Sequence, residues 1–465
     1  MGNEGIAYHR DMRFVRLFVL GVIIIGSLGL AGGWYLAGRE AGPAITIASP
    51  EKFIGRAGTA AVTVESPTTV GRVNVVLEQN GQSSSVASYA GAAAPQTRVE
   101  LSGSVGKASQ PALVNGPARL VVTASRPVFF GLRTAESTAT RDLTVRLDPP
   151  RIAVVSIHHF INPGGVEFVV LRASPEDVDA GVLVGDDDYR AYPGAAVGLA
   201  DPALRVAFFA LKHDQDVNAR VSAYARDEAG NVATTALDHQ PTNKKFLQSK
   251  IPIDQGFLDR VVPAIASNTP ELKIDTASPE GLLKGFLAIN GDLRRKNADT
   301  ITALAAKSRP EMSWKDAFLQ MGNSQVESRF ADRRTYFFDD KEIDRQVHLG
   351  FDLASVQRAP VHAANTGIVV FADFLGIYGN CVILDHGLGV QSLYAHMSSL
   401  GVKPGDSVTK GQELGRTGST GLAGGDHLHF TMLLQGVPVN PVEWWDPHWM
   451  EDRVFRKIRD AGGRR

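Results

Sequence analysis

The sequence predicts a mainly β protein: two β-sandwich modules, a helical connector and a C-terminal antiparallel β domain, all behind one apolar N-terminal helix. Three observations predict this fold class. They are an uncharged apolar run near the N-terminus, short alternating strands through the first half, and helical spacing between residues 246 and 322. The 465 residues are too many for one ordinary core. An apolar fraction of 44% and a charged fraction of 21% are typical of globular proteins.

Net charge and cysteine content exclude two further classes. The formal net charge is -1, so nothing steers the whole chain toward nucleic acid, and we expect no nucleic-acid partner. Cys381 is the single cysteine, which excludes an intramolecular disulfide. Outside the cytosol, the stability of this chain must therefore come from packed cores and metal.

Residues 17–37 form the apolar run, LFVLGVIIIGSLGLAGGWYLA, which carries no charge. Its length matches the roughly 20 residues that cross a bilayer as a helix. Arginines precede it at positions 10, 13 and 16, so the positive-inside rule leaves residues 1–16 cytoplasmic and residues 40 onward outside. We expect a retained single-pass anchor. A cleaved signal peptide is the alternative, but its apolar region normally spans about 7–15 residues before a small-residue cleavage site, and no clear site follows here.

Short strands separated by turn residues fill residues 43–148 and 151–240. In both segments apolar runs such as Arg72–Leu77 recur about every ten residues, a pattern typical of β-sandwiches. Pro149-Pro150 separates the two segments as a linker would. The second segment closes with the turn Asp227-Glu-Ala-Gly-Asn231, which resembles bacterial immunoglobulin-like modules. We expect spacers, with an envelope protein as a candidate partner.

Residues 246–322 show helical spacing. Asp254 is placed to cap a first helix. Ser278, followed by proline, predicts the start of a second, whose apolar residues between 282 and 293 fall on one face. A third helix is expected over 299–306. The sequence leaves open whether these helices pack on the C-terminal domain or act as a hinge over it.

Ionisable residues gather in three β segments after about residue 324. The first contains His348 and Asp352, and positions four apart return to the same face of a strand or of a slightly bulged strand. The second is a predicted hairpin whose later strand carries His396. The third is a glycine-rich loop running into His427-Leu-His429, where residues two apart point to one strand face.

Four histidines and one aspartate suit a catalytic zinc site. Such a site takes three protein ligands and leaves a fourth position for water. Two histidines and the aspartate would meet that need, leaving two histidines for proton transfer and oxyanion stabilisation. The loop at 415–421 lacks the Gly-Lys-Ser/Thr ending of a phosphate loop. The chain also lacks the His-Glu-x-x-His helix of the common helical zinc proteases.

The three motifs in this order, together with the Tyr394-Ala-His396 segment and the hairpin, resemble the lysostaphin/LytM-type zinc peptidases, peptidase family M23. The resemblance covers roughly residues 330–445 and does not extend to residues 40–320. It implies that one zinc ion per chain is held by His348, Asp352 and His429, and that His396 and His427 are the catalytic histidines. Which of these two takes a proton from water and which stabilises the oxyanion stays open.

The same resemblance implies an endopeptidase that cuts peptide bonds in peptidoglycan cross-links or stem peptides. The metal would lower the pKa of a bound water toward ~7 and polarise the scissile carbonyl. Asp426 stands where the family often carries a proline or small residue, and we expect it to cap the turn rather than bond an imidazole. We expect His386, at the hairpin turn, to be structural, and His362 to be a substrate-side or core residue.

The leading hypothesis is a zinc endopeptidase anchored in the bacterial inner membrane, with its N-terminus cytoplasmic and its catalytic domain outside. The alternative is a wall-binding or hydrolase-activating regulator with the same fold that does not cut. Such relatives have usually lost ligands, and none is lost here. In a third hypothesis the β modules carry the main function, as part of an envelope assembly, and the peptidase domain is a passenger. The predicted organisation is a cytoplasmic segment (1–16), a transmembrane anchor (17–37), a β-sandwich module (43–148), an immunoglobulin-like module (151–240), a helical connector (246–322), a zinc peptidase domain (324–447) and a C-terminal tail (448–465).

Overall fold

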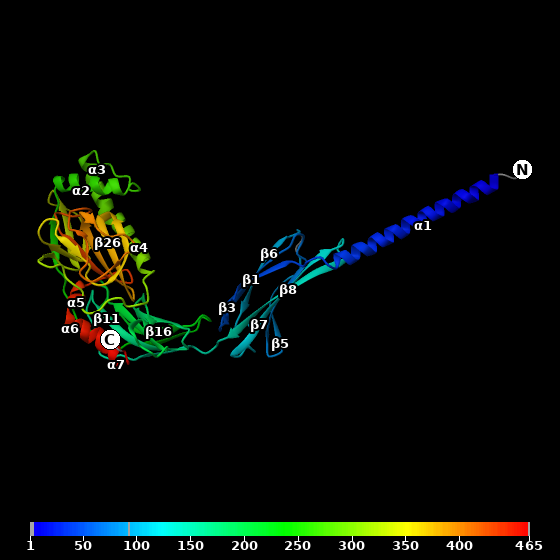
Figure 1. The fold of residues 1–465 in the computed structure, drawn as a ribbon, viewed down its shortest axis with the longest axis horizontal. Coiled ribbons are helices and arrows are strands. Elements are labelled where there is room, and N and C mark those ends of the chain that lie inside the picture. Colours follow the sequence, from blue (N-terminus) through cyan, green and yellow to red (C-terminus); the bar gives the residue numbers. More distant parts are fainter. Residues whose placement is uncertain (1–3, 92–93, 464–465) are drawn as a thin grey trace. The chain divides into compact units, whose positions relative to one another are not determined.

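A computed structural model describes residues 4–91 and 94–463 (Figure 1). The chain divides into two compact units. One holds Met1–Pro149 with Asp227–Asn231, and the other holds Pro150–Arg226 with Val232–Arg465. The described part is mainly β, as the sequence predicts.

An apolar helix begins the chain. Helix α1 covers Glu4–Ala37, and its portion Phe14–Ala37 is long and apolar enough to cross a membrane, with a hydropathy of 2.3. Its large apolar side chains face outward; Ile25, for example, is 72% exposed. An outward apolar surface is what a lipid-facing helix requires. The predicted apolar helix is therefore confirmed, and both an anchor and a signal sequence fit it.

The first β segment is a pair of sheets around one core. One sheet has the order β1-β3-β6 and the other β2-β8-β7-β4-β5. Alternate residues of the longer central strands, such as Val64, Val75 and Leu120, are buried in the shared core, because side chains two apart lie on one face. The strands are β1 (Ala44–Ser49), β2 (Phe53–Ile54), β3 (Gly58–Glu65), β4 (Arg72–Gln79), β5 (Gln82–Tyr89), β6 (Arg98–Val105), β7 (Gly116–Val128) and β8 (Arg133–Val145).

The second β segment is likewise a pair of sheets, here of four strands each, ordered β14-β15-β11-β9 and β13-β12-β16-β17. Its core is built around Phe168, Val182 and Phe208, all fully buried. The immunoglobulin-like character of this module stays a prediction. The strands are β9 (Arg151–Val154), β10 (Phe160–Ile161), β11 (Val166–Ser174), β12 (Asp179–Val184), β13 (Asp187–Arg190), β14 (Tyr192–Pro193), β15 (Leu204–Ala210), β16 (Val221–Arg226), β17 (Val232–Ala236) and β18 (Gln240–Pro241).

The connector packs on the C-terminal domain, the first of the two arrangements that the sequence left open: its apolar residues share a core with Tyr336 and Ile377. Its helices begin where the caps predict: the side chain of Asp254 accepts a hydrogen bond from the Phe257 N–H, and that of Ser278 from Gly281 N–H. The third helix starts at Arg294, earlier than predicted, because a π-helical turn continues the second helix into it. The elements are β19 (Gln248–Pro252), α2 (Gln255–Asn268), α3 (Pro279–Ala288), η2 (Ile289–Leu293) and α4 (Arg294–Ala305).

The C-terminal domain is built on an eight-stranded sheet, ordered β20-β23-β31-β27-β26-β25-β29 with β32 paired to β31. All its pairings are antiparallel, and β26 and β27 form the predicted hairpin. Strand β19 of the connector joins β21 and β22 in a second sheet. The strands are β20 (Gln325–Ser328), β21 (Asp332–Phe338), β22 (Lys341–His348), β23 (Phe351–Ala354), β24 (Pro360–His362), β25 (Gly367–Phe374), β26 (Asn380–Gly387), β27 (Val390–Met397), β28 (Ser399–Leu400), β29 (Ser407–Val408), β30 (Glu413–Arg416), β31 (Leu428–Leu434) and β32 (Val437–Val439).

The His348–Asp352 segment is not the single strand that the spacing suggested. Strand β22 ends at His348 in one sheet, and β23 begins at Phe351 in the other. The chain crosses between the sheets at Gly350, where an added Cβ would lie 2.5 Å from the ring of His429. Only glycine allows so close an approach, and this brings His348 and Asp352 together by a different route.

The C-terminal helices pack against the second β module within the same unit. Lys457 donates to the buried carboxylate of Glu167 at 2.8 Å. The rings of Trp444 and Phe208 lie 5.5 Å apart at their centroids. The second module and the C-terminal domain therefore share one core. The helices are α5 (Pro441–Trp445), α6 (Pro447–Met450), η4 (Glu451–Phe455) and α7 (Arg456–Asp460).

Candidate metal centre

Three neighbouring strands place the predicted ligands. Asp352 on β23 is the direct cross-strand partner of His429 on β31, so their side chains share one face of the sheet. His348 reaches them from the end of β22. All three residues are buried. The cross-strand register therefore fixes two of the three ligand positions, and the second sheet supplies the third.

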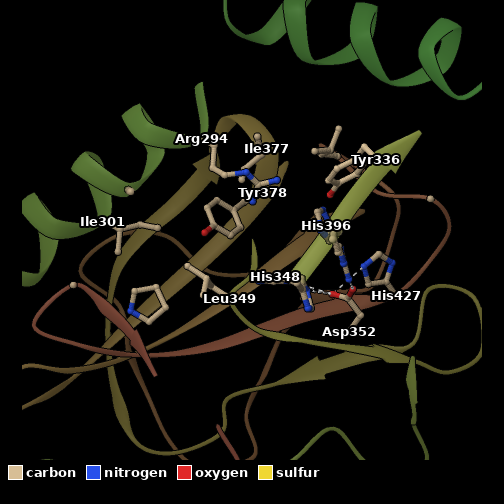
Figure 2. A pocket seen from close by; sticks show the side chains of 17 residues that line it. Arg294, Ile301, Tyr336, His348, Leu349, Asp352, Ile377, Tyr378, His396 and His427 are labelled. Carbon is tan, nitrogen blue, oxygen red and sulfur yellow. Dashed lines mark hydrogen bonds and ion pairs between the residues drawn. The ribbon is translucent and has the colours of Figure 1, made fainter. Parts of the chain in front are cut away.

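Ligand atoms of these three residues form a tight triangle (Figure 2). His348 Nε2 lies 2.9 Å from Asp352 Oδ1 and 3.0 Å from His429 Nδ1. His429 Nδ1 lies 3.0 Å from the same oxygen of Asp352. Ligands held 2.0–2.1 Å from a tetrahedral zinc stand roughly 3.3 Å apart, so these spacings are near those of a zinc site.

Outer hydrogen bonds fix which ring nitrogen of each histidine faces inward. His348 donates its Nδ1–H to the backbone oxygen of Arg329 at 3.1 Å. His429 donates its Nε2–H to Thr431 Oγ1 at 2.9 Å, and that hydroxyl donates onward to Leu349 O. The inward nitrogens then carry lone pairs, as Asp352 Oδ1 does. Three lone pairs about 3 Å apart repel one another unless a cation lies among them, so this donor set fits a divalent metal.

Arg334, on β21, holds the second oxygen of the aspartate. Its Nη2 donates to Asp352 Oδ2 at 3.0 Å and to Ser328 Oγ at 2.7 Å, leaving Oδ1 for the centre. Burial alone would raise the pKa of Asp352. The charge of His348, together with the close polar contacts of His348, His427 and His429, outweighs burial and holds the pKa of this carboxyl well below its usual range. The carboxylate therefore stays ionised.

The remaining two histidines stand beside the triangle. His396 donates Nδ1–H to Thr420 O at 2.7 Å, and His427 donates Nδ1–H to Gly425 O at 2.9 Å. Their Nε2 atoms are therefore free to act as bases or, once protonated, as donors. Their ring centroids are 4.9 Å apart, and His427 Nε2 is 3.5 Å from Asp352 Oδ1. The structure thus brings together all five residues that the sequence predicted.

The surroundings shift the pKa values of these histidines in opposite directions. Burial holds the pKa of His396 well below its usual range and lowers that of His429 to about 4. Burial also acts to lower the pKa of His427, but its contact with the Asp352 carboxylate outweighs this and raises the value. His396 also has a positive φ of 62°, a backbone strain that clusters at functional sites.

Comparison with known proteins assigns the region that contains this site to a family. Residues 346–441 match Peptidase family M23. The C-terminal region is an M23 metallopeptidase domain. It is similar to the DD-carboxypeptidase/endopeptidase Mpg of Neisseria meningitidis, at 42% identity over 21% of this chain and 22% of that protein. It is also similar to the peptidoglycan DD-endopeptidase ShyA of Vibrio cholerae, at 28% identity over 35% of this chain and 34% of that protein. This chain therefore spans only a fifth to a third of the length of these relatives.

Among solved structures, the M23 domain aligns with the catalytic domain of lysostaphin from Staphylococcus simulans. The alignment has 26% identity and a TM-score of 0.25, and it covers 28% of this chain and 98% of that one. A putative peptidase M23 from Pseudomonas aeruginosa aligns with 18% identity and a TM-score of 0.37, over 61% of this chain and 94% of that one.

Other polar residues of the M23 domain have structural partners. Asp426 accepts from Thr417 Oγ1 at 2.6 Å and from Arg358 N–H at 3.1 Å, so it holds the loop, as expected. His386 is fully buried between Thr366 O and Ser392 Oγ. His362 is exposed on β24 and does not line the cavity that holds the five site residues.

Three residues of the site were not predicted from the sequence, and they differ in whether a sequence pattern marks them. Thr431 lies two positions after His429 on the same strand face, so strand alternation could have identified it. Arg334 precedes the ligand segment on a separate strand, and its spacing gives no signal. Arg294, on α4, lines the same cavity from outside the matched region (Figure 2).

Proposed function

We propose that the chain is a membrane-anchored zinc endopeptidase that hydrolyses peptide bonds in peptidoglycan cross-links or stem peptides. One observation carries the proposal: inward lone pairs of His348, Asp352 and His429 converge within an M23 domain, beside two further histidines. The names of two relatives, a DD-carboxypeptidase/endopeptidase and a peptidoglycan DD-endopeptidase, support this substrate class.

In this proposal His348, Asp352 and His429 hold one zinc ion per chain. The bound zinc would supply a Lewis acid that polarises the scissile carbonyl and acidifies water. Arg334 keeps Oδ2 of Asp352 occupied, so the carboxylate presents Oδ1. His396 and His427 present Nε2 to the reacting groups. One accepts the proton of the attacking water, and the other donates to the oxygen that gains negative charge.

The N-terminal helix supports a location at the bacterial inner membrane, with residues 1–16 cytoplasmic and the M23 domain outside. Peptidoglycan lies on that side, so the anchor would hold the enzyme near its substrate. In this scheme the two β modules act as spacers, or dock an envelope protein.

Purified full-length chain in detergent tests the proposal. We expect about one zinc per chain by elemental analysis, and mass spectrometry should find peptides released from purified sacculi. His348→Ala should lose both, whereas His362→Ala, an exposed histidine outside the cavity, should keep both. Unchanged zinc content and digestion in His348→Ala would show that the site is wrongly assigned. Binding of sacculi without peptide release, in zinc-loaded protein, would point to the non-hydrolytic regulator instead.

A further inference from the structure

Helix α4 supplies one wall of the cavity that contains the metal centre. The cavity has a volume of about 230 Å³, and residues of α4, including Arg294 and Ile301, line it together with the five site residues. Arg294 lies near Tyr378 on the side of the cavity away from Asp352 (Figure 2). This helix precedes residues 346–441, the part of the chain that matches the family.

The guanidinium of Arg294 is held in place by the π-helical turn η2, which directly precedes α4. It donates from Nε to Asn290 O at 3.1 Å and from Nη2 to Asn290 Oδ1 at 2.6 Å. Asn290 is fully buried and donates to Asp344 at 2.7 Å, which fixes its amide. Across residues 4–91 and 94–463, no carboxylate forms an ion pair with Arg294. A half-buried cation is thus oriented at the cavity without an anionic partner.

Apolar side chains form part of the cavity wall shared by Arg294 and the metal centre. Ile301, Leu349 and Pro438 line it, together with Tyr378, whose ring centroid lies 5.7 Å from that of His429. Apolar walls lower the local dielectric and strengthen the attraction between a fixed cation and an anion that enters. An arginine fork also matches the two oxygens of a carboxylate better than any neutral group.

We propose that Arg294 binds a free main-chain carboxylate on the residue that supplies the amine of the scissile bond. The residue on the carbonyl side of the scissile bond has its main-chain carbonyl in that bond. A neighbouring residue with a free main-chain carboxylate must therefore lie on the amine side. Hydrolysis then adds water to the carbonyl carbon, breaks the C–N bond and releases an amine that carries this carboxylate. The inference rests on the proposed function and specifies its substrate: peptides with a carboxylate beside the bond.

A matched pair of substrates tests this subsite with the zinc-loaded full-length chain. Mass spectrometry of sacculus digests first identifies the bond that is cut. Two synthetic peptides are then built around it, with a carboxylate or a carboxamide on the amine-side residue. Losing a charge-assisted bond in a partly desolvated site costs about 10- to 100-fold in kcat/KM, so we expect the wild type to prefer the carboxylate by that factor.

Variants separate recognition from folding. Arg294→Gln should remove the preference. It should lower kcat/KM for the carboxylate peptide by raising KM, and it should change kcat/KM for the carboxamide peptide by less than about threefold. Arg295→Gln, which alters the exposed neighbouring arginine paired with Asp292, should leave kcat/KM for both peptides unchanged. Equal wild-type cleavage of both peptides, equal losses in Arg294→Gln, or a cut bond without this carboxylate would overturn the subsite alone. A zinc-loaded wild type that cuts nothing would overturn the proposed function as well.

Discussion

Replacing Thr431 with valine removes the group that orients a proposed zinc ligand while nearly preserving side-chain volume. Thr431 is 1% exposed, and its hydroxyl accepts from His429 Nε2–H at 2.9 Å while donating to Leu349 O at 2.9 Å. Valine leaves this buried N–H without an acceptor and releases the ring to rotate. An unsatisfied buried group costs about 1–3 kcal/mol, and loss of such an outer partner weakens metal binding about 10- to 100-fold.

Competition with a chromophoric zinc chelator measures this change directly in the full-length protein. We expect the zinc dissociation constant of Thr431→Val to rise by about 10- to 100-fold. Thermal unfolding of the metal-free protein reports separately on any general loss of stability. Thr300→Val, which removes an exposed hydroxyl bonded to the α4 backbone, is the matched control. A zinc affinity within threefold of wild type, or an equal loss in the control, would refute the orientation argument.

Two further changes probe the charges of this unit. Arg334→Met leaves Asp352 Oδ2 without its partner, so zinc affinity should fall about tenfold in the same titration, while Arg333→Met on the exposed side of β21 should leave it unchanged. Burial raises the pKa of Glu443 from 4.5 to about 7. The folded state therefore holds this proton more tightly, and the free energy of unfolding should fall by about 3 kcal/mol as pH rises from about 4.5 through 7. Glu443→Gln should flatten that slope in denaturant titrations, and an unchanged slope would contradict the assignment.

His396, His427 and His429 could be placed from the sequence because strand periodicity is a local property, whereas the roles of the five site residues came from the resemblance to the family. His427 and His429 share a face by alternation, and the hairpin that carries His396 is marked by its glycine turn. The helix starts were equally local, since Asp254 and Ser278 each cap a helix within three residues. Such features need no knowledge of the tertiary structure.

The crossing at Gly350 could not be predicted in the same way. The segment from His348 to Asp352 has the spacing of one strand, and only the approach of His429 from a distant strand shows that glycine is required there. Arg294 is a stronger case, because it precedes the family match by about fifty residues and reaches the cavity only when α4 packs on the domain. Contacts between segments far apart in sequence leave no local pattern.

The junction between the second β module and the M23 domain shows why such long-range contacts matter. Glu167, on β11, is fully buried and pairs with Lys457 of α7. Glu443 of α5 accepts from the backbone N–H of Val166 at 2.8 Å. Removing the module would take these partners from Lys457 and Glu443 and expose the buried ring of Trp444, and exposing a large buried apolar side chain costs roughly 1.5–3 kcal/mol. The module therefore acts as part of the peptidase unit's core, and a spacer hinged at this junction would have to break that core.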